Sequence, residues 1–381
     1  MYLSKRDATE TNPEIMHYSS ELYQSAIDLL KQLISTPSFS KEEDKTADLI
    51  CKHLSAHGVE YLKMDNNVFA FNKFFDPAKP TILLNSHHDT VRPSKGYTMD
   101  PFTPVVKEGK LFGLGSNDAG GPLVSLIATF IHFYNKSDLR YNLIIAATAE
   151  EEISGSGGVE ALLNHSLFLE PLNGQLPESA IVGEPTQMQM AVAERGLLVI
   201  DAVAYGKSGH AARGEGINAI NIALKDIEWI NAYQFTKESP LLGKVKASVT
   251  VIETENKAHN VVPAQCKFVI DGRVNELYSF EEVLDTLRAN LKSEIIPRST
   301  RLRSTSIALN HPLVVSGIAL GRSYYGSPTT SDKALMPFPA LKMGPGDSAR
   351  SHTADEYIYL NEIEEGIDLY IQLLNGVISA K

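Results

Sequence analysis

The sequence is short of cysteine, of long apolar runs and of basic charge, and each shortage excludes a class of protein. Its 381 residues include only two cysteines, Cys51 and Cys266, too few for a disulfide framework or a cysteine-type zinc site. No apolar run is long enough to span a bilayer. The net charge of -11 disfavours nucleic acid, whose binding depends on clustered Lys and Arg.

What is present is the composition of an ordinary globular protein, with 43% hydrophobic and 21% charged residues. A chain of this length can form two domains with well-buried cores. The segment Met1–Met16 is polar and charged and contains no apolar signal core. Together these features predict a soluble cytoplasmic protein that binds neither nucleic acid nor membrane.

Strand-like apolar runs alternate with helical segments over the first half of the chain. Thr81–Asn85 and Leu143–Thr148 are nearly continuously apolar, as expected for strands covered on both faces. Ser40 and Glu43 have capping-box spacing, which predicts a helix from Ser40 to about His57. The other expected elements are helices at Ser20–Leu33, Gly121–Tyr134 and Gly158–Leu163 and strands at Val68–Asn72 and Ala180–Val182. This alternation predicts an α/β domain with a mixed or parallel sheet.

The pattern changes near Glu194. The expected order there is strand 196–204, helix 219–233, strands 246–254 and 265–274, helix 280–291 and strand 301–308. This β-α-β-β-α-β order is the ferredoxin-like pattern. The chain then returns to helix and loop and ends in a helix at Asn361–Leu374. We therefore expect a catalytic α/β domain formed by residues 1–193 and 309–381, with an α+β domain inserted at 194–308.

Two imidazoles and a carboxylate, His87-His88-Asp89, directly follow a predicted buried strand. Because side chains alternate along an extended chain, His87 and Asp89 should point to one side and His88 to the other. A histidine that binds a metal often donates its second ring nitrogen to a carboxylate, which fixes the ring. The motif fits a metal ligand, His87, oriented by Asp89; the alternative is a polar loop with three chance residues.

Acidic residues follow further turns and strands. Asp118 ends a glycine-rich turn, the triplet Glu150–Glu152 follows an apolar strand, and Glu184 follows another strand and a glycine. Open α/β sheets place their ligands at the carboxyl ends of the strands. Clustered carboxylates there repel one another unless a cation relieves them. The alternatives are a helix-capping Asp118 and a solvated acidic loop.

A rigid Gly/Pro loop beginning at Gly344 presents His352. Taken alone, it is an ordinary solvent-exposed histidine. Taken with the other motifs, it is a candidate second imidazole for a metal centre.

Together these stretches resemble the cytoplasmic zinc exopeptidase and deacylase family, which contains acetylornithine deacetylase, succinyl-diaminopimelate desuccinylase, glutamate carboxypeptidase and aminoacylase. The H-x-D, G-x-x-x-x-D, E-E, G-E-P and late-His motifs occur in the family's order between about Ile27 and Leu374. The resemblance implies a mixed-sheet zinc-exopeptidase-like catalytic domain. It also implies a role for each motif residue: Asp118 bridges two ions, His87 and Glu184 complete one position, Glu152 and His352 complete the other, Glu151 is the general base, and Asp89 orients His87.

The inserted segment resembles the family's lid and dimerisation domain. The stretch Gly206–Ala212 matches its G-x-x-x-H pattern, which implies that His210 reaches into the partner subunit's active site and stabilises the oxyanion. Asn260 and Arg273 lie in matches to the N-x-V-P and D-x-R signatures, which implies that they bind substrate. Without the resemblance, a turn histidine and an arginine in a strand-end salt bridge are the simpler interpretations.

The sequence departs from the family pattern at several positions, and none of these departures removes a ligand. Ala119–Gly121 replaces the usual residues after the bridging Asp, and Ser351 replaces the usual Ala before the late His. Arg213 stands where many members have Pro. Arg213 and Arg350 are additional cations expected near the site, where they bear on substrate choice; for an acidic acyl group such as succinyl, one of the two is the candidate to face it.

The implied reaction is amide hydrolysis assisted by two divalent ions, with zinc expected and cobalt as the alternative. The length and the T-A-E-E-E and G-E-P-T stretches look closest to acetylornithine deacetylase. We therefore expect a cytoplasmic homodimer that deacetylates N-acetyl-L-ornithine in arginine biosynthesis. The alternatives are a deacylase of succinyl-diaminopimelate, succinylornithine or acetylcitrulline, a metallo-dipeptidase, or a non-catalytic small-molecule-binding protein on the same fold.

Overall fold

The computed structural model describes residues 18–379, which form two compact units. The first unit contains the chain up to Val192, Ile307–Tyr325 and the chain from Phe338 onward. The second contains Ala193–Ser306 and Gly326–Pro337. The prediction for Met1–Met16 falls outside the described residues. Within 18–379, none of the helices combines the length and the apolar character needed to cross a membrane.

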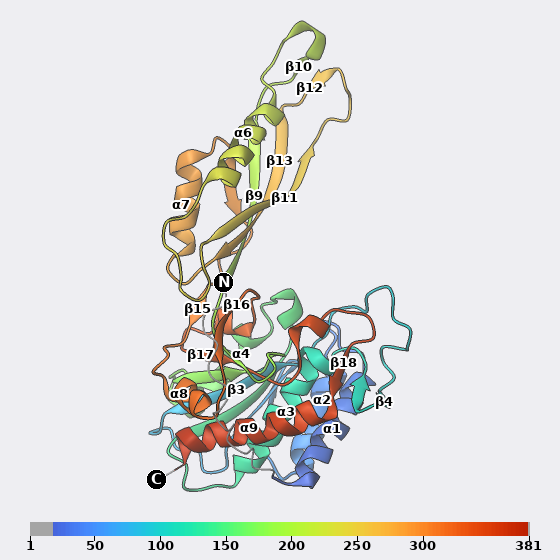
Figure 1. Ribbon diagram of the computed structural model, residues 1–381, viewed down its shortest axis with the longest axis vertical. Coiled ribbons are helices and arrows are strands. Elements are labelled where there is room, and N and C mark those ends of the chain that lie inside the picture. The colour runs from blue at the N-terminus through green and yellow to red at the C-terminus, as the bar shows by residue number, and fades with distance from the viewer. Residues whose placement is uncertain (1–17, 380–381) are drawn as a thin grey trace, which may run out of the picture. The chain divides into compact units, whose positions relative to one another are not determined.

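A mixed sheet forms the centre of the first unit (Figure 1). Its strands are β1 (Leu62–Met64), β2 (Asn67–Phe71), β3 (Thr81–His87), β6 (Asn142–Thr148), β7 (Ser179–Val182), β8 (Met190–Glu194) and β17 (Ala340–Lys342). They are ordered β1-β2-β6-β3-β7-β17-β8, and β6, β3, β7 and β17 run parallel. The carboxyl ends of these four strands therefore share one edge of the sheet.

Helices cover the sheet of the first unit. They are α1 (Ser20–Ile34), α2 (Asp44–Ala56), α3 (Gly121–Tyr134), α4 (Val159–Leu163), α5 (Ser166–Leu169), α8 (Pro312–Ala319) and α9 (Leu360–Ile378). Figure 1 shows α1, α3 and α9 side by side, and they pack on one another. Every residue of β3 and β6 is buried, as the apolar runs predict. A separate small sheet contains β4 (Val105–Lys107), β5 (Lys110–Phe112) and β18 (Tyr357–Tyr359).

The predicted helix start at Ser40 is wrong. Helix α2 begins at Asp44. The hydroxyl of Ser40 instead donates a 2.7 Å hydrogen bond to the Asp89 carboxylate. A buried carboxylate far away in sequence therefore takes the hydroxyl that the local pattern assigned to capping.

The second unit has the ferredoxin-like arrangement expected from the sequence. Its elements are β9 (Gly196–Tyr205), α6 (Ala219–Ala232), β11 (Lys246–Thr254), β13 (Gln265–Val274), α7 (Phe280–Asn290) and β14 (Glu294–Pro297). The antiparallel sheet has the order β11-β13-β9-β14, and residues of α6 and α7 form a core with it. This order places the first and third strands at the centre, as the β-α-β-β-α-β pattern requires.

The last strand of this pattern lies earlier than predicted. We expected it at Arg301–Ala308, but β14 (Glu294–Pro297) fills that place by pairing with β9. The later segment contributes only β15 (Thr305–Ser306), which pairs with β8. Residues 294–297 and 301–308 are both short and irregular in sequence, so the sequence does not indicate which of the two pairs with β9.

Gly326–Pro337, which the sequence-based division assigned to the C-terminal part, belongs to the second unit. The Glu194 carboxylate accepts hydrogen bonds from the backbone and hydroxyl of Ser331, and the Arg195 amide donates to the Ser327 carbonyl. These bonds tie the later segment to the start of the second unit.

Candidate metal centre and active site

Three parallel strands bring candidate ligands to one edge of the sheet. His87 is the last residue of β3 and pairs with Thr148, the last residue of β6. Asn85 of β3 pairs with Val182, the last residue of β7. The glutamate triplet follows β6 and Glu184 follows β7, so both continue past the same edge. This is where parallel sheets place their ligands.

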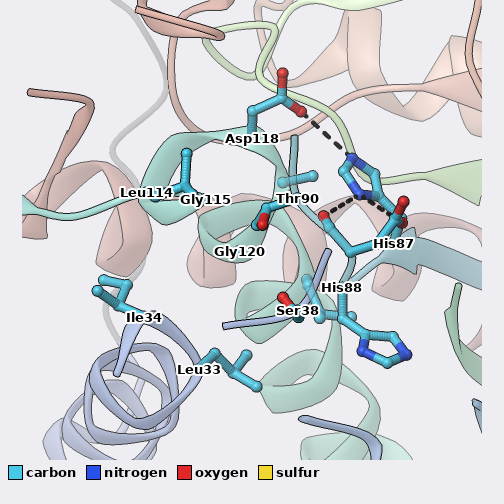
Figure 2. Close-up of a pocket in the computed structure, with 13 residues that line it drawn as sticks. Leu33, Ile34, Ser38, His87, His88, Thr90, Leu114, Gly115, Asp118 and Gly120 are labelled. Atoms are coloured by element: carbon cyan, nitrogen blue, oxygen red, sulfur yellow. Dashed lines mark hydrogen bonds and ion pairs between the residues drawn. The ribbon is translucent and has the colours of Figure 1, made fainter. Parts of the chain in front are cut away.

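His87 and Asp118 point toward one another (Figure 2). His87 is 1% exposed, and its Nε2 lies 3.3 Å from Asp118 Oδ1. Its Nδ1 lies 3.0 Å from the backbone carbonyl of Asp89, which holds the ring and leaves Nε2 facing the site. His88 points away, as expected, and its ring contacts the Thr46 hydroxyl at 2.9 Å.

The second imidazole faces the other oxygen of Asp118. His352 Nε2 lies 3.7 Å from Asp118 Oδ2 and 3.0 Å from Glu152 Oε2. His352 has a φ of 59°, a left-handed conformation that is uncommon outside glycine and gathers at functional sites. One carboxylate therefore faces two histidines from segments far apart in the chain.

Two further carboxylates lie close to His87. Glu151 Oε2 is 3.9 Å and Glu184 Oε1 is 4.0 Å from its Nε2. The ligand atoms of His87, Glu151 and Glu184 all lie within 4.8 Å of one another, and so do those of His87, Asp118 and Glu152. Glu151 is therefore as close to His87 as the candidate ligand Glu184 is, and the distances fit either a metal ligand or a general base at Glu151.

Asp89 organises the loop that carries these glutamates. Its two oxygens accept the backbone N–H groups of Glu151 and Glu152, both at 3.1 Å. Burial favours the neutral carboxyl, but hydrogen bonds from His87 and Ser40 outweigh it and lower the pKa of Asp89. An ionised Asp89 thus fixes His87 and both glutamates at once.

Glu150 does not join the cluster. Its carboxylate turns back to accept the Gly157 N–H at 3.2 Å, while its own N–H donates to Glu43 at 3.2 Å. Of the triplet, only Glu151 and Glu152 face the candidate ligands.

Glu356 is a residue of the candidate site that the sequence reasoning missed. It is buried, and its oxygens accept the backbone N–H groups of Gly115, Asn117 and Asp118 at 2.8–3.0 Å. Gly115 has a φ of 73°, which glycine adopts without strain and which shapes this turn. Burial and the charge of Asp118 raise the pKa of Glu356 to about 7. Its place four residues after His352 was the available signal.

Burial and neighbouring charges raise the pKa values of several groups in the cluster. Burial raises the pKa of Glu184 to about 8, and a hydrogen bond to Glu152 raises the pKa of His352 to about 9. Burial opposes protonation of His87, but hydrogen bonds to Asp118 and Asp89 outweigh it and raise its pKa. Metal ligands must be deprotonated, so a divalent ion would displace these protons. Two imidazoles with several carboxylates form a donor set that fits zinc.

A cavity of about 20 Å³ lies beside His87 and Asp118, with Leu33 and Leu114 on its apolar side (Figure 2). The Thr90 hydroxyl, which borders it, has no hydrogen-bond partner among the described residues. A cavity of this size holds about one water molecule. It is therefore not the substrate pocket.

His210 and Asn260 come together at one end of the second unit. There β10 (Gly209–His210) pairs with β12 (Val261–Val262), and both labels appear at that end in Figure 1. The Ala211 N–H donates to the Asn260 carbonyl at 3.0 Å, and both predicted residues are exposed.

Arg273 lies at the opposite end of this sheet. It pairs with Leu197 at the start of β9, whereas Gln265 at the other end of β13 pairs with Tyr205. Arg273 is eight positions after Gln265, which is about 26 Å along an extended strand. The Asp271 carboxylate accepts from Nε and Nη2 of Arg273 at 2.8 and 3.0 Å, the salt bridge that the sequence left as an alternative.

Arg350, one of the two cations expected near the site, is paired within its own part of the fold. Its guanidinium makes two 2.7 Å hydrogen bonds to Glu362 and lies over the ring of Tyr357. A guanidinium held in this way braces the loop before His352. Arg213 is exposed and lies 4.0 Å from Glu215.

Comparison with known proteins identifies the same family as the sequence motifs do. The family model described as peptidase family M20/M25/M40 matches residues 83–376. Acetylornithine deacetylase of Proteus mirabilis is 29% identical over 92% of this chain and 96% of its own. Succinyl-diaminopimelate desuccinylase 2 of a Ruegeria species is 28% identical over 68% of this chain and 67% of its own.

Among solved structures, a dinuclear metal binding peptidase of the M20 family from Bacillus subtilis has the same fold. The TM-score is 0.70 at 16% identity, over 93% of this chain and 98% of that one. The family match covers most of the sequence, including all of the candidate ligands. The chain therefore belongs to the peptidase family M20/M25/M40 and is a metal-dependent amide hydrolase.

Proposed function

We propose that this protein hydrolyses the amide of an Nα-acyl-L-amino acid at a dinuclear metal centre, with N-acetyl-L-ornithine as the first candidate substrate. The observation that carries the proposal is Asp118, whose two oxygens face His87 and His352 at 3.3 and 3.7 Å. In this assignment Asp118 is shared, Glu184 completes the position at His87, and Glu152 completes the position at His352. Zinc is the expected metal, because mixed histidine and carboxylate ligation with an open place suits it.

Each residue of the site then has a separate role in hydrolysis of the amide. Divalent ions bound here would polarise the amide carbonyl and increase the acidity of water. Glu151 accepts the proton from the attacking water and delivers it to the leaving amine nitrogen. Its backbone is held by Asp89, which keeps its carboxylate beside His87. The products are the free acyl acid and the free amino acid.

The substrate assignment rests on the relatives and on one guanidinium. The acetylornithine deacetylase from Proteus mirabilis matches nearly the whole chain, whereas the desuccinylase matches about two thirds of it. Asp271 engages Nε and Nη2 of Arg273, and Nη1 makes no hydrogen bond to the described residues. Asp271 can thus orient Arg273 while Nη1 receives a substrate carboxylate.

A hydrolysis screen of the zinc-loaded protein tests this proposal. The panel is acetylornithine, acetylcitrulline, succinylornithine, succinyl-diaminopimelate and several dipeptides, followed by release of the free amine. We expect acetylornithine to have the highest kcat/KM. A higher kcat/KM for succinyl-diaminopimelate or for unblocked dipeptides would assign the protein to the alternative substrate while leaving the metal chemistry unchanged.

Arg273→Ala should raise KM for a free-acid substrate by roughly tenfold or more, because a charge-assisted hydrogen bond is lost. The C-amidated form of the same substrate should be little affected. Arg298→Ala is the matched control, since Arg298 makes a similar two-point pair with Asp201 in the same unit. Equal rates of the wild-type enzyme on amidated and free-acid substrates would contradict a carboxylate clamp at Arg273.

We also propose that the enzyme is a homodimer in which His210 and Asn260 serve the partner's active site. Arg273 lies about 26 Å along the sheet from the His210 end, so one short substrate cannot touch both in one chain. A second copy removes this conflict, because one chain can supply Arg273 and the other His210. Strand β11, at the sheet edge, exposes Val251 and Ile252 and suits contact with another chain.

Mixing a His210→Ala chain with a Glu151→Gln chain should restore activity that neither variant has alone. In a mixed dimer, one site receives Glu151 from the first chain and His210 from the second. The measurement is turnover after co-refolding, with each variant refolded alone as the control. A wild-type protein that sediments as a monomer with full activity would rule out the shared site.

A further inference from the structure

A buried lysine, Lys342, lies on the strand next to the one that leads to Glu184. Lys342 is the last residue of β17, is 5% exposed, and pairs with Val182 of β7. Glu184 follows Val182 by two residues and is 8% exposed. The ladder continues past the end of β7, because the Gly183 N–H donates to the Asn85 carbonyl at 2.7 Å and the Met343 N–H donates to the Val182 carbonyl at 2.9 Å. Side-chain alternation then puts Glu184 on the face shared by Val182 and Lys342, two positions past the residue that Lys342 pairs with. Two strand positions of about 3.3 Å and one inter-strand spacing of about 4.8 Å separate their Cα atoms by roughly 8 Å, which is within reach of a lysine side chain.

The charge of Lys342 acts on the groups around Glu184. Burial raises the pKa of Glu184 to about 8, and the charge of Lys342 is the strongest influence in the opposite direction. Half-buried Tyr325 responds to both groups: burial raises its pKa, Lys342 lowers it, and Glu184 raises it. The charges acting on His352 are different, because they are the carboxylates Glu152, Asp118 and Glu356.

We propose that Lys342 is a positioning residue whose fixed positive charge holds Glu184 in the metal-free protein and weakens divalent-ion binding at the position formed by His87, Asp118 and Glu184. This inference rests on the dinuclear centre proposed above. A buried carboxylate is costly without an opposite charge, and Lys342 supplies that charge when no metal is bound. When an ion binds, Lys342 and the ion become like charges on either side of Glu184, at low local dielectric.

It follows that the two positions differ in affinity for a metal ion, because the charge of Lys342 acts on only one of them. The lysine belongs to the position at Glu184, whereas the position at His352 is surrounded by acids. Removing the charge of Lys342 should therefore change one of the two metal-binding steps and leave the other in place.

The test is a calorimetric zinc titration of the metal-free full-length protein, with a competing chelator for the tighter step. In Lys342→Met, one of the two dissociation constants should fall by roughly tenfold or more, since repulsion between like charges at low dielectric is removed. Metal-free Lys342→Met should melt at a lower temperature than the wild type, and zinc should raise its melting temperature by more.

Two controls separate charge from packing. Lys342→Arg keeps the charge and should keep the wild-type constants. Lys333→Met removes another buried lysine, 1% exposed, from the second unit, and should destabilise the metal-free and zinc-loaded forms equally without changing either constant. Lys342→Gln, measured in the same way, replaces the methionine variant if that variant does not fold.

The outcomes distinguish this inference from the proposed function. Two bound ions in the wild type with unchanged constants in Lys342→Met would overturn the role of Lys342 and leave the metal centre standing. Fewer than two bound ions in the wild type would overturn the dinuclear assignment itself. A selective gain in one constant, reversed in Lys342→Arg, supports the inference.

Discussion

Replacing Glu151 with glutamine is expected to reduce kcat by about 10²–10⁴-fold while leaving the metal content unchanged, which is the range typical of a lost general base. Glutamine has nearly the same shape but cannot accept the proton of the attacking water. The backbone N–H of residue 151 would still donate to Asp89, so the loop should keep its position. Steady-state turnover and metal analysis of the same preparation measure both effects.

The neighbouring glutamates provide matched comparisons for this variant. Glu152→Gln should lose one ion, because Glu152 Oε2 lies 3.0 Å from His352 Nε2 at the second position. Glu150→Gln should retain turnover, since the Glu150 carboxylate accepts the Gly157 N–H and a glutamine oxygen can do the same. All three variants alter one carboxylate of the same loop.

If Glu151→Gln and Glu152→Gln gave the opposite results, the roles assigned to these two glutamates would be exchanged. Glu151 Oε2 lies 3.9 Å from His87 Nε2, and Glu184 Oε1 lies 4.0 Å from the same atom. Loss of an ion in Glu151→Gln, with full metal content and low turnover in Glu152→Gln, would make Glu151 a ligand and Glu152 the base. The two measurements together therefore decide the assignment.

The sequence predicted the parts of the fold that follow from burial periodicity. The runs that became β3 and β6 are buried on both faces and left little choice of structure. Helix α3 (Gly121–Tyr134) matches its predicted range, because an apolar stretch follows two glycines and a proline. The acids behind these strands were predictable as a cluster for the same reason, since parallel strands end at a common edge.

The remaining errors come from partners that are distant in sequence. The Ser40 hydroxyl fits a cap locally, yet it donates to Asp89, 49 residues away. The Glu362 carboxylate accepts two hydrogen bonds from Arg350, which the sequence had offered as a cation for substrate choice. Lys342 looks like one polar residue in an apolar strand until the sheet register sets it diagonal to Glu184. None of these contacts produces a periodic pattern, so the sequence alone gave no signal for them.

Replacing Asp118 with asparagine should have the largest effect on the metal centre, because it removes the carboxylate shared by both positions. Asparagine keeps one acceptor oxygen but presents an amide nitrogen in place of the second. Substituting a residue that only supports a ligand typically costs 10–100-fold in affinity, so losing a shared ligand should cost more than about 100-fold. We expect activity to fall to background and at most one ion to remain after dialysis.

The comparison with Glu184→Gln is what identifies a shared ligand. Glu184→Gln should lose the ion at the His87 position alone, whereas Asp118→Asn should weaken both positions, because its two oxygens face His87 and His352 at 3.3 and 3.7 Å. Asp100→Asn is the control, since this exposed aspartate, within residues 18–379, forms side-chain hydrogen bonds to Phe102 and Thr103 of its own turn. Two ions retained in Asp118→Asn would show that Asp118 does not join the two positions. Each ion would then be held by its own set of glutamates, with Glu151 the nearest available replacement at His87.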